Sequence, residues 1–247
     1  MSHVFWVPFD SIEVGAVITI DGDEGHHAVR VRRIGVGETV EVMNGAGTRA
    51  KGVVSTVLKA SCEVTVTHIE EVKPCLPRIT VVQALVKKDR ADQAIELLTE
   101  VGVDAVIPWA AQRSITKEVP SKWPRIALES CKQSRQARLP DIAPLTTTDA
   151  VVDFINHISG KGVALLCHET ATTAIAEVIA EFPSAQQIGI VIGPEGGLTD
   201  EETARFIAAG ARKVRLGPSV LRAATAGAVA ASIVSALTSR WQLEDKS

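Results

Sequence analysis

Residues 188–199 read IGIVIGPEGGLT, and this stretch indicates the fold class. The apolar run 188–192 is typical of a strand buried on both faces, and the Gly-Pro-Glu-Gly-Gly turn ends it. A helix over 200–209 is predicted to follow, with Thr199 or Asp200 as its N-cap. A strand that leads through a glycine turn into a helix predicts an α/β protein with a parallel sheet.

The sequence on both sides of this stretch repeats the pattern. Apolar runs predict further strands at 79–85, 105–109, 163–167 and 213–216. Stretches with helical spacing lie between or after these runs, at 89–101, 123–138, 170–180 and 223–241. Strands that alternate with helices predict a mostly parallel sheet with helices on both faces.

The first 72 residues have a different character, because short runs there alternate apolar and polar residues. These runs lie at 16–20, 38–43 and 62–69, and residues 25–35 are typical of a helical turn with one basic face. Asn44-Gly45 predicts a hairpin turn, so we expect a small barrel or sandwich. Two prolines make residues 73–77 typical of a linker. The predicted domains are therefore 1–72, a small β-barrel, and 78–247, the α/β domain.

Composition excludes several protein classes. The chain has 247 residues, of which 46% are apolar and 22% charged, so global disorder is excluded. The four cysteines, at 62, 75, 131 and 167, form no C-x-x-C pair, and no histidine lies at zinc spacing. His26-His27 lacks third and fourth ligands. We therefore expect neither a disulfide scaffold nor a metal site.

Charge and hydropathy bear on location and partners. The start of the chain lacks the basic and apolar regions of a signal peptide. The small-apolar stretch 223–237 is shorter than the roughly 20 residues of a membrane span. We therefore expect a cytoplasmic protein without a membrane partner. The net charge of −3 argues against bulk binding of nucleic acid, but basic residues cluster at 30–33, 87–90 and 132–138.

Three predicted strand ends carry residues that suit a ligand site. They are 167–169 (Cys-His-Glu), 193–197 and 216–222 (LGPSVLR), and ligands of open α/β sheets bind beyond the carboxyl ends of strands. His168 and Glu169 could serve as acid and base, but adjacent residues of an extended chain point to opposite faces. Ser219 has no evident His and Asp partners and lies in no G-x-S-x-G elbow, so a serine hydrolase is poorly supported.

The glycine loop indicates the chemistry of the ligand. Gly196 and Gly197 permit positive φ and close approach of a ligand to the backbone. The loop matches neither G-x-G-x-x-G nor the Walker A motif, so it does not favour NAD or ATP. It suits a pocket whose backbone groups bind a flat heterocycle, although a tight strand-to-helix turn has the same sequence. The second Gly-Pro strand end, at 217–218, favours the pocket.

Five blocks of sequence carry a family resemblance. They are HHAVRVRRIGVGETVEVMNGAG, VVQALVKKDRADQAIELLTEVGVDAVIPWAAQRS, ESCKQSRQARLPDI, IGPEGGLTDEE and LGPSVLRAATA. In this order they resemble the RsmE family, the 16S ribosomal RNA (uracil-N3)-methyltransferases of the SPOUT superfamily. The resemblance implies an N-terminal PUA-like β-barrel and a C-terminal SPOUT domain with a deep trefoil knot, assembled as a homodimer.

The resemblance also implies a cofactor and its residues. S-adenosylmethionine would bind in the knot near the dimer interface, and the alanine-rich helix at the C-terminus would close the knot and pack on the partner. The cofactor-binding residues so implied are Leu166, His168, Glu169, Ile192, Gly193, Pro194, Gly196, Gly197, Leu216, Gly217, Ser219, Val220, Leu221 and Ala226.

The implied reaction is methylation of N3 of one uridine in the decoding region of 16S ribosomal RNA, within the small ribosomal subunit. The base must be unpaired or extruded to react. Arg222 and Arg138 are the candidate catalytic residues, which would position the uridine or hold its negative charge. No general base is assigned. The residues expected to contact RNA are Arg30, Arg32, Arg33, Lys87, Lys88, Arg90, Lys132 and Arg135.

The chain departs from the family at informative positions. Members commonly read Leu-Arg-Thr-Glu-Thr-Ala in the last block, whereas this chain has Ala223 and Ala224. Lys132 stands where Glu is common, and Arg135 where Gly is common. Two alternatives therefore stay open. One is a SPOUT-fold RNA-binding protein with impaired or no catalysis, and the other is an unrelated α/β enzyme with a nucleotide cofactor. Turnover and cofactor identity distinguish them.

Overall fold

The computed structural model describes residues 3–242, apart from the side chain of Lys88, and they form two compact units. The first unit combines Met1–Pro74 with Cys131–Leu139, and the second combines Cys75–Ser130 with Pro140–Ser247. The boundary at 74/75 falls inside the predicted linker. Residues 131–139 differ from the prediction, which placed them in the second domain.

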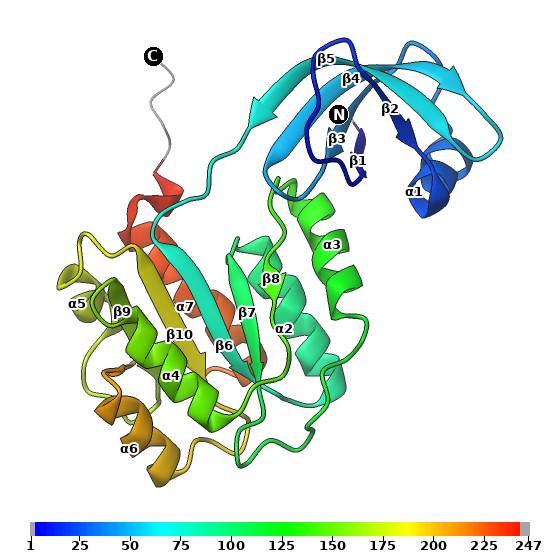
Figure 1. Ribbon diagram of the computed structural model, residues 1–247. Helices are drawn as coiled ribbons and strands as arrows, with labels where there is room; N and C mark the ends of the chain where they lie inside the picture. The colour runs from blue at the N-terminus through cyan, green and yellow to red at the C-terminus, as the bar shows by residue number, and fades with distance from the viewer. Residues whose placement is uncertain (1–2, 243–247) are drawn as a thin grey trace. The chain divides into compact units, whose positions relative to one another are not determined.

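The first unit is built on a five-stranded mixed sheet. Its elements are β1 (His3–Trp6), β2 (Val17–Ile20), α1 (Gly22–His26), the π-helical η1 (His27–Val31), β3 (Thr39–Met43), β4 (Thr48–Val57) and β5 (Cys62–Glu71). The strand order is β1-β3-β4-β5-β2 (Figure 1). The β1–β3 pair is parallel and the other pairs are antiparallel. Alternate residues of these strands, such as Val40 and Val42, are buried in one core.

Residues 131–139 dock on the β3–β4 turn of the first unit. The Gly47 amide donates to the Ala137 carbonyl at 3.0 Å, and Arg138 Nε donates to the Val72 carbonyl at 2.9 Å. A Cβ at Gly47 would lie 2.3 Å from the Arg138 guanidinium, so this contact needs glycine. The segment therefore belongs to the first unit because it completes the backbone hydrogen bonding of the turn.

The second unit is a six-stranded sheet with helices. Its elements are β6 (Arg78–Ala84), α2 (Lys88–Glu100), β7 (Ala105–Trp109), α3 (Trp123–Ser134, which enters the first unit), β8 (Asp141–Ile142), α4 (Thr148–Ile158), β9 (Gly162–Cys167), α5 (Ile175–Ala180), β10 (Gln187–Ile192), α6 (Asp200–Ala208), β11 (Arg212–Val214), α7 (Ala223–Leu237) and the 3₁₀ turn η2 (Ser239–Trp241).

All pairs in this sheet are parallel, in the order β11-β9-β10-β6-β7-β8. Helices α4 and α6 pack on one face, and α2 and α7 pack together on the other (Figure 1). Strands buried on both faces need near-continuous apolar sequence, which is why runs such as 188–192 predicted them. The α/β class with a parallel sheet is therefore confirmed.

Two predicted helices are shorter than expected because other contacts replace their hydrogen bonds. Helix α3 was expected to reach residue 138, but Arg135 adopts a left-handed φ of +57° and the helix ends before it. Helix α5 was expected from residue 170. Instead the Arg215 amide donates to the Thr173 carbonyl, and the Ile175 amide donates to the Arg215 carbonyl. This bridge keeps the preceding chain extended.

The C-terminal helix is also shorter than predicted. Helix α7 ends at Leu237 rather than 241, because Thr238 is extended. Strand β11 covers 212–214 rather than 213–216. No ranges had been predicted for β1, β8 and α4, and β4 had been implied only by the hairpin turn at Asn44-Gly45. No helix in the described part of the chain, α7 included, is both long and apolar enough to cross a bilayer.

After β11 the chain crosses the carboxyl edge of the sheet. Strand β11 is an edge strand beside β9, but the next element, α7, packs on the central strands β6 and β10 and on α2. Residues 215–222 therefore pass the ends of β9 and β10. This recrossing is what the predicted C-terminal knot requires.

Arg240, in η2 after the last helix, bonds to residues near the start of the second unit. Its Nη1 donates to Asp104 Oδ2 at 2.7 Å and to the Pro77 carbonyl at 2.8 Å, and its Nη2 donates to the Gly102 carbonyl. Asp104 Oδ2 also accepts from the Ile79 amide at 2.7 Å. The two charged side chains are only 7% and 13% exposed, so each depends on the other for its solvation.

Candidate functional site

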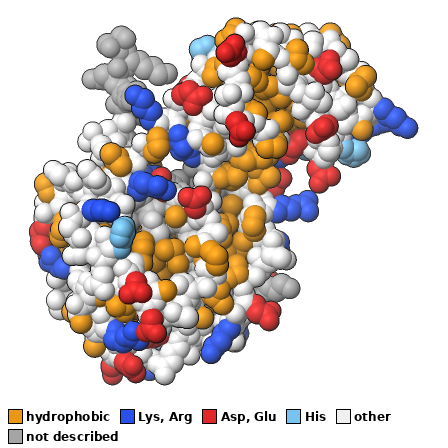
Figure 2. Space-filling model, viewed as in Figure 1, with side chains coloured by type: hydrophobic (Ala, Val, Ile, Leu, Met, Phe, Trp, Pro, Cys, Tyr) orange, Lys and Arg blue, Asp and Glu red, His pale blue; other side chains and the backbone are white. Residues whose placement is uncertain are grey.

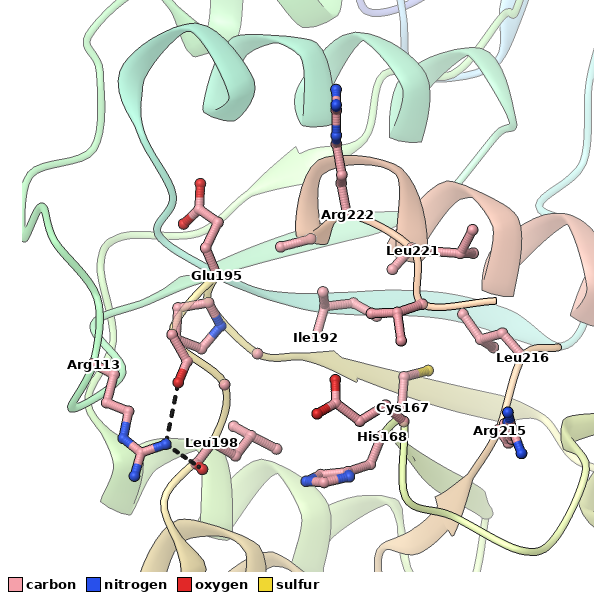
Figure 3. A pocket seen from close by; sticks show the side chains of 18 of the residues that line it. Arg113, Cys167, His168, Ile192, Glu195, Leu198, Arg215, Leu216, Leu221 and Arg222 are labelled. Carbon is pink, nitrogen blue, oxygen red and sulfur yellow. Dashed lines mark hydrogen bonds between the residues drawn. The ribbon is translucent and has the colours of Figure 1, made fainter. Parts of the chain in front are cut away.

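A cavity of about 600 Å³ opens at the carboxyl edge of the parallel sheet (Figure 3). The loops after β9, β10 and β11 and the first turn of α7 form most of its wall. They meet here because parallel strands present their carboxyl ends at one edge. All the predicted cofactor residues line the cavity except Leu166, whose side chain is buried in the core beneath it.

The glycine loop presents bare backbone to the cavity. Gly197 has a φ of +73° and its amide donates to the Pro194 carbonyl at 2.9 Å. A Cβ at Gly193 would lie 3.0 Å from the Leu198 side chain. The loop therefore needs glycine for its turn and for its packing, and it offers peptide groups rather than side chains to a ligand.

Arg113 braces this loop from the segment that follows β7. Its Nη1 donates to the carbonyls of Gly196 and Leu198, at 3.1 and 3.2 Å (Figure 3). A Cβ at Gly196 would lie 3.2 Å from the Arg113 Cβ. Arg113 was not among the predicted site residues, because only three strand ends were considered. The end of β7 lies at the same edge of the sheet and was the available signal.

Glu202 holds the Arg113 segment to α6. Its carboxylate accepts from the Gln112 amide at 2.8 Å and from the Thr199 amide at 3.0 Å. Thr199 Oγ1 in turn accepts from the Glu202 amide at 3.1 Å, which completes a capping box. Glu202 is only 4% exposed. Thr199 is thus the N-cap, and the cap also fixes a wall of the cavity.

Glu195 connects the glycine loop to the start of α2. Its Oε1 accepts from the Lys87 amide at 3.4 Å and lies 3.6 Å from Arg90 Nη1. Arg90 lines the cavity, but its charge is already paired with Glu195. Lys87 is exposed, and the side chain of Lys88 lies outside the described residues.

His168 presents a hydrogen-bond donor to the cavity. Burial, followed by the nearby charge of Lys213, lowers the pKa of His168 below 6.5, against the opposing effects of Glu169 and Asp200. Its Nδ1 accepts from the Thr170 amide at 3.2 Å. The neutral ring therefore carries its proton on Nε2, an assignment that follows from this hydrogen bond. His168 can donate from Nε2 but cannot act as a base there.

Two arginines of the last loop differ in their bonding. Arg215 donates to the carbonyls of Gly217 and Pro218, at 2.9 and 3.0 Å, and so closes its own loop. Arg222 is exposed at the start of α7, and within the described chain its guanidinium makes no hydrogen bond or ion pair. Its charge is therefore available to a ligand. Arg138 is not among the residues that line the cavity.

Other chemistry in the cavity is limited. Cys167 lines it, but burial raises the pKa of this thiol to about 12, so it is no thiolate nucleophile near neutral pH. In the described residues, no three His, Cys, Asp or Glu side chains group in a way that could hold a metal ion.

The predicted RNA-contact residues of the first unit differ in availability. Arg30, Arg32, Arg33 and Arg135 are exposed. Lys132 Nζ instead donates to Glu24 Oε1 at 2.5 Å, and both side chains are largely buried. Charges of both signs are interspersed on the face seen in Figure 2. Arg32 Nε donates to His27 Nε2 at 3.2 Å, so these exposed arginines also differ in their bonding.

Comparison with known proteins gives consistent matches. An RNA methyltransferase PUA domain model matches residues 20–67, and an RNA methyltransferase domain model matches 73–235. The protein called ribosomal RNA small subunit methyltransferase E of Mycobacterium tuberculosis is 40% identical over 237 residues, which cover 93% of this chain and 90% of that relative.

Solved structures are similar over the whole fold. Ribosomal RNA small subunit methyltransferase E from Neisseria gonorrhoeae, bound to S-adenosyl methionine, has a TM-score of 0.86 at 22% identity, with 96% of this chain and 98% of that chain covered. A probable rRNA-methyltransferase from Porphyromonas gingivalis has a TM-score of 0.83 at 27% identity, with 97% and 100% covered. These likenesses confirm the predicted fold class, with a PUA-like domain before the α/β domain.

Proposed function

The chain belongs to the ribosomal RNA small subunit methyltransferase E (RsmE) family, and from this premise we propose that it transfers a methyl group from S-adenosylmethionine to N3 of one uridine in 16S ribosomal RNA. The substrate would be the decoding region of the small ribosomal subunit, in the cytoplasm. The observation that carries the proposal is the cavity, because three loops far apart in sequence converge there with a glycine backbone wall.

The residues present fit S-adenosylmethionine. The cavity volume lies within the roughly 300–1,000 Å³ of small-ligand sites. Apolar side chains such as Leu216 and Leu221 suit a flat adenine, and the bare backbone of 193–197 suits its polar edge. Carboxylates of Glu169 and Asp200 at the wall favour a cationic ligand. When bound, the cofactor supplies an electrophilic methyl carbon, which suits uracil N3 once N3 has lost its proton.

Arg222 is assigned the catalytic contact with the uridine. Because no protein base is assigned, the N3 proton would pass to water; its loss leaves negative charge on uracil O2 and O4, and a guanidinium beside these oxygens stabilises that charge. Arg222 is unpaired at the cavity, whereas Arg90 and Arg215 are bonded within the protein. Arg138 is bonded to the Val72 carbonyl in the first unit. We therefore assign Arg138 to holding segment 131–139 and not to contact with the uridine.

The contacts that hold the glycine loop in place would align the methyl donor with the uracil base. Arg113 holds the loop directly, through the Gly196 carbonyl, and Glu202 holds the segment that carries Arg113, through the Gln112 amide. A wall that is already in place holds the methyl donor against the base without further loss of freedom, and such alignment is a large part of catalysis. His168 would add a neutral N–H donor at the cavity wall.

RNA binding is assigned to the first unit. Arg30, Arg32, Arg33 and Arg135 are exposed there, and such cations position a protein on phosphates without reading sequence. Lys132 is left out of this surface because Glu24 neutralises it. Specificity would come from the shape and unpaired bases of the folded RNA.

We also propose that the chain acts as a homodimer. A second groove of about 490 Å³ lies beside the loop 215–218, with Ile175 and Ile233 in its lining. Val220, two residues beyond this loop, is 74% exposed. An exposed apolar side chain next to an apolar groove suits contact with another protein surface. Light scattering at micromolar concentration should give the dimer mass, and a monomer mass would contradict this part of the proposal.

The reaction can be tested directly. The purified protein is incubated with labelled S-adenosylmethionine and small ribosomal subunits from cells that lack this modification. We expect 3-methyluridine at one site of the decoding region, identified by nuclease digestion and mass spectrometry of the nucleosides. Cofactor binding without methylation of any nucleoside would contradict the proposal.

A second candidate function rests on Ala223 and Ala224. They occupy the first turn of α7, where Ala223 lines the cavity and Ala224 is buried, so that turn offers no side chain for proton transfer. A SPOUT-fold RNA-binding protein without catalysis would have this composition. Restoring Thr at 223 and Glu at 224 separates the candidates, because activity that appears only in that variant favours the non-catalytic protein.

A further inference from the structure

A chain of three polar side chains leads to the wall of the cavity. Lys213 Nζ donates to Thr170 Oγ1 at 2.8 Å, and Thr170 Oγ1 lies 3.1 Å from His168 Nδ1. His168 lines the cavity (Figure 3). Lys213 and Thr170, although both belong to the described part of the chain, are not among the lining residues. These two residues therefore reach a bound ligand through the histidine rather than by direct contact.

The backbone brings the three side chains together. Lys213 lies on β11, and the neighbouring Val214 carbonyl accepts from the His168 amide at 3.0 Å. The Ala171 amide donates to the His168 carbonyl at 3.1 Å, so the chain turns directly after β9. This turn places the amide and the hydroxyl of Thr170 beside the imidazole ring. The arrangement therefore depends on the pairing of β9 with β11 and on one tight turn.

The ammonium group of Lys213 sets the direction of these hydrogen bonds. An ammonium donates and cannot accept, so Thr170 Oγ1 accepts from Lys213. The hydroxyl hydrogen of Thr170 is then available to His168 Nδ1, which also accepts from the Thr170 amide at 3.2 Å. Two donors thus point at Nδ1, and the ring keeps its proton on Nε2. Protonation of Nδ1 would break both bonds.

The charged groups around the ring act in opposite directions. Partial burial has the largest effect and lowers the pKa of His168, and Lys213 of β11 lowers it further. Glu169 of the same loop and Asp200 of α6 act the other way and raise it. The other charged side chains of the cavity wall are Arg90, Arg113, Glu195, Arg215 and Arg222. The ring is therefore neutral near neutral pH although two carboxylates act on it.

The methyl donor and its product differ in charge at one atom. S-adenosylmethionine carries a positive sulfonium, and loss of the methyl group leaves S-adenosylhomocysteine with a neutral thioether sulfur. This sulfur lies in the middle of the molecule, so a charge on the cavity wall acts on it whichever way the ligand lies. A neutral His168 beside Glu169 and Asp200 favours the sulfonium, whereas a protonated ring would oppose it. The thioether has no such dependence on the charge of the ring.

We propose that Thr170 and Lys213 are positioning residues that hold His168 as a neutral Nε2–H donor, and that the cavity thereby prefers the cationic methyl donor to its neutral product. The inference rests on the proposed function for the identity of the two ligands. A cavity with this preference releases the product after transfer and binds the donor again.

Calorimetric titration of the full chain with each ligand, between about pH 5.5 and pH 8, measures the preference as the ratio of two dissociation constants. The amino-acid part is the same in both ligands, so its own titration cancels in the ratio. A full positive charge beside the sulfonium should lower the preference by about fivefold. Thr170→Val and Lys213→Met let the ring take up its second proton more easily. At about pH 6 these variants should therefore prefer S-adenosylmethionine about two- to threefold less than the wild type does.

Three control variants make the result specific. Thr170→Ser keeps the hydroxyl group and should match the wild type. Arg212→Met removes the neighbouring cation of β11, which pairs with Glu181 at 2.7 Å, and should leave the preference unchanged. His168→Gln keeps an N–H donor that does not titrate in this range, so its preference should not vary with pH.

Nitrogen NMR of protein labelled at its histidine rings tests the hydrogen bonding without any ligand. The His168 signals are identified by their absence from His168→Gln. In the wild type Nε2 should carry the proton, and in Thr170→Val and Lys213→Met the ring should take up its second proton at a higher pH. The inference is overturned if Nδ1 carries the proton in the wild type, if both variants titrate as the wild type does, or if the affinity ratio does not follow the charge of His168.

Failure of this inference is distinguishable from failure of the proposed function. If the wild type binds both ligands and the ratio of their affinities ignores the charge of His168, only the inference fails. If the wild type binds neither ligand, the proposed function fails and the preference fails with it. The NMR titration then still decides whether Thr170 and Lys213 hold the ring.

Discussion

Replacing Arg113 by Ala should weaken binding of S-adenosylmethionine without unfolding the protein. The substitution removes the two hydrogen bonds, of 3.1 and 3.2 Å, that hold the Gly196 and Leu198 carbonyls. Each such bond contributes about 0.5–1.5 kcal/mol net, and exposure of Arg113 to water places both in the lower half of that range. Together they amount to about 1–2 kcal/mol, which the ligand must supply to order the loop. The expected loss of affinity is therefore about 5–30-fold.

Calorimetric titration of the full chain with S-adenosylmethionine measures this loss. Arg125→Ala is the matched control, because Arg125 is an exposed arginine of the same unit with no hydrogen bond or ion pair in the described structure. Its affinity should equal that of the wild type. If Arg113→Ala binds the cofactor within twofold of wild type while its melting temperature is unchanged, the brace does not order the loop and the reasoning fails.

Three further predictions concern stability and turnover. Arg240→Ala should lower the free energy of unfolding by about 3–5 kcal/mol in urea, because Asp104 is left buried without its cation, whereas the double variant R240M/D104L should recover most of the loss. The pKa of His168 is lowered, so its contribution to stability is complete above pH 6.5 and is lost as the pH falls through the folded-state pKa; identical pH profiles for the wild type and His168→Gln would contradict this. Arg222→Ala should lower kcat about 10²–10³-fold in single-turnover methylation, since it removes one donor to the developing negative charge, and unchanged kcat would exclude the role assigned to it.

The sequence by itself determined the elements whose pattern is local. The run 105–109 was predicted with the bounds that β7 has, and 188–192 with those of β10 to within a residue. Burial on both faces requires a continuous apolar run, so a strand of this kind is visible without its neighbours. The sequence also limited the N-cap of α6 to Thr199 or Asp200, and the structure shows Thr199, whose partner Glu202 is three residues away. The glycine turn after β10 was likewise readable, because a left-handed φ at Gly197 leaves few other residues suitable.

Only the tertiary structure decided which charges are free. Lys132 and Arg138 looked like members of one basic cluster with Arg135, but Lys132 pairs with Glu24 and Arg138 with the Val72 carbonyl. These partners lie 108 and 66 residues away along the chain. Contacts between residues so far apart produce no recognisable pattern in the local sequence. The sequence alone could therefore not distinguish a cation that is paired in the fold from one that is available to a ligand.

The same reason explains the remaining differences at the cavity. Arg113 reaches the glycine loop across 83 residues of sequence, and the late start of α5 depends on its bridge to Arg215. The local pattern determined that loops would follow β9, β10 and β11. Which side chains brace those loops was decided by packing, because the free energy of each brace depends on two segments that only the folded sheet brings together.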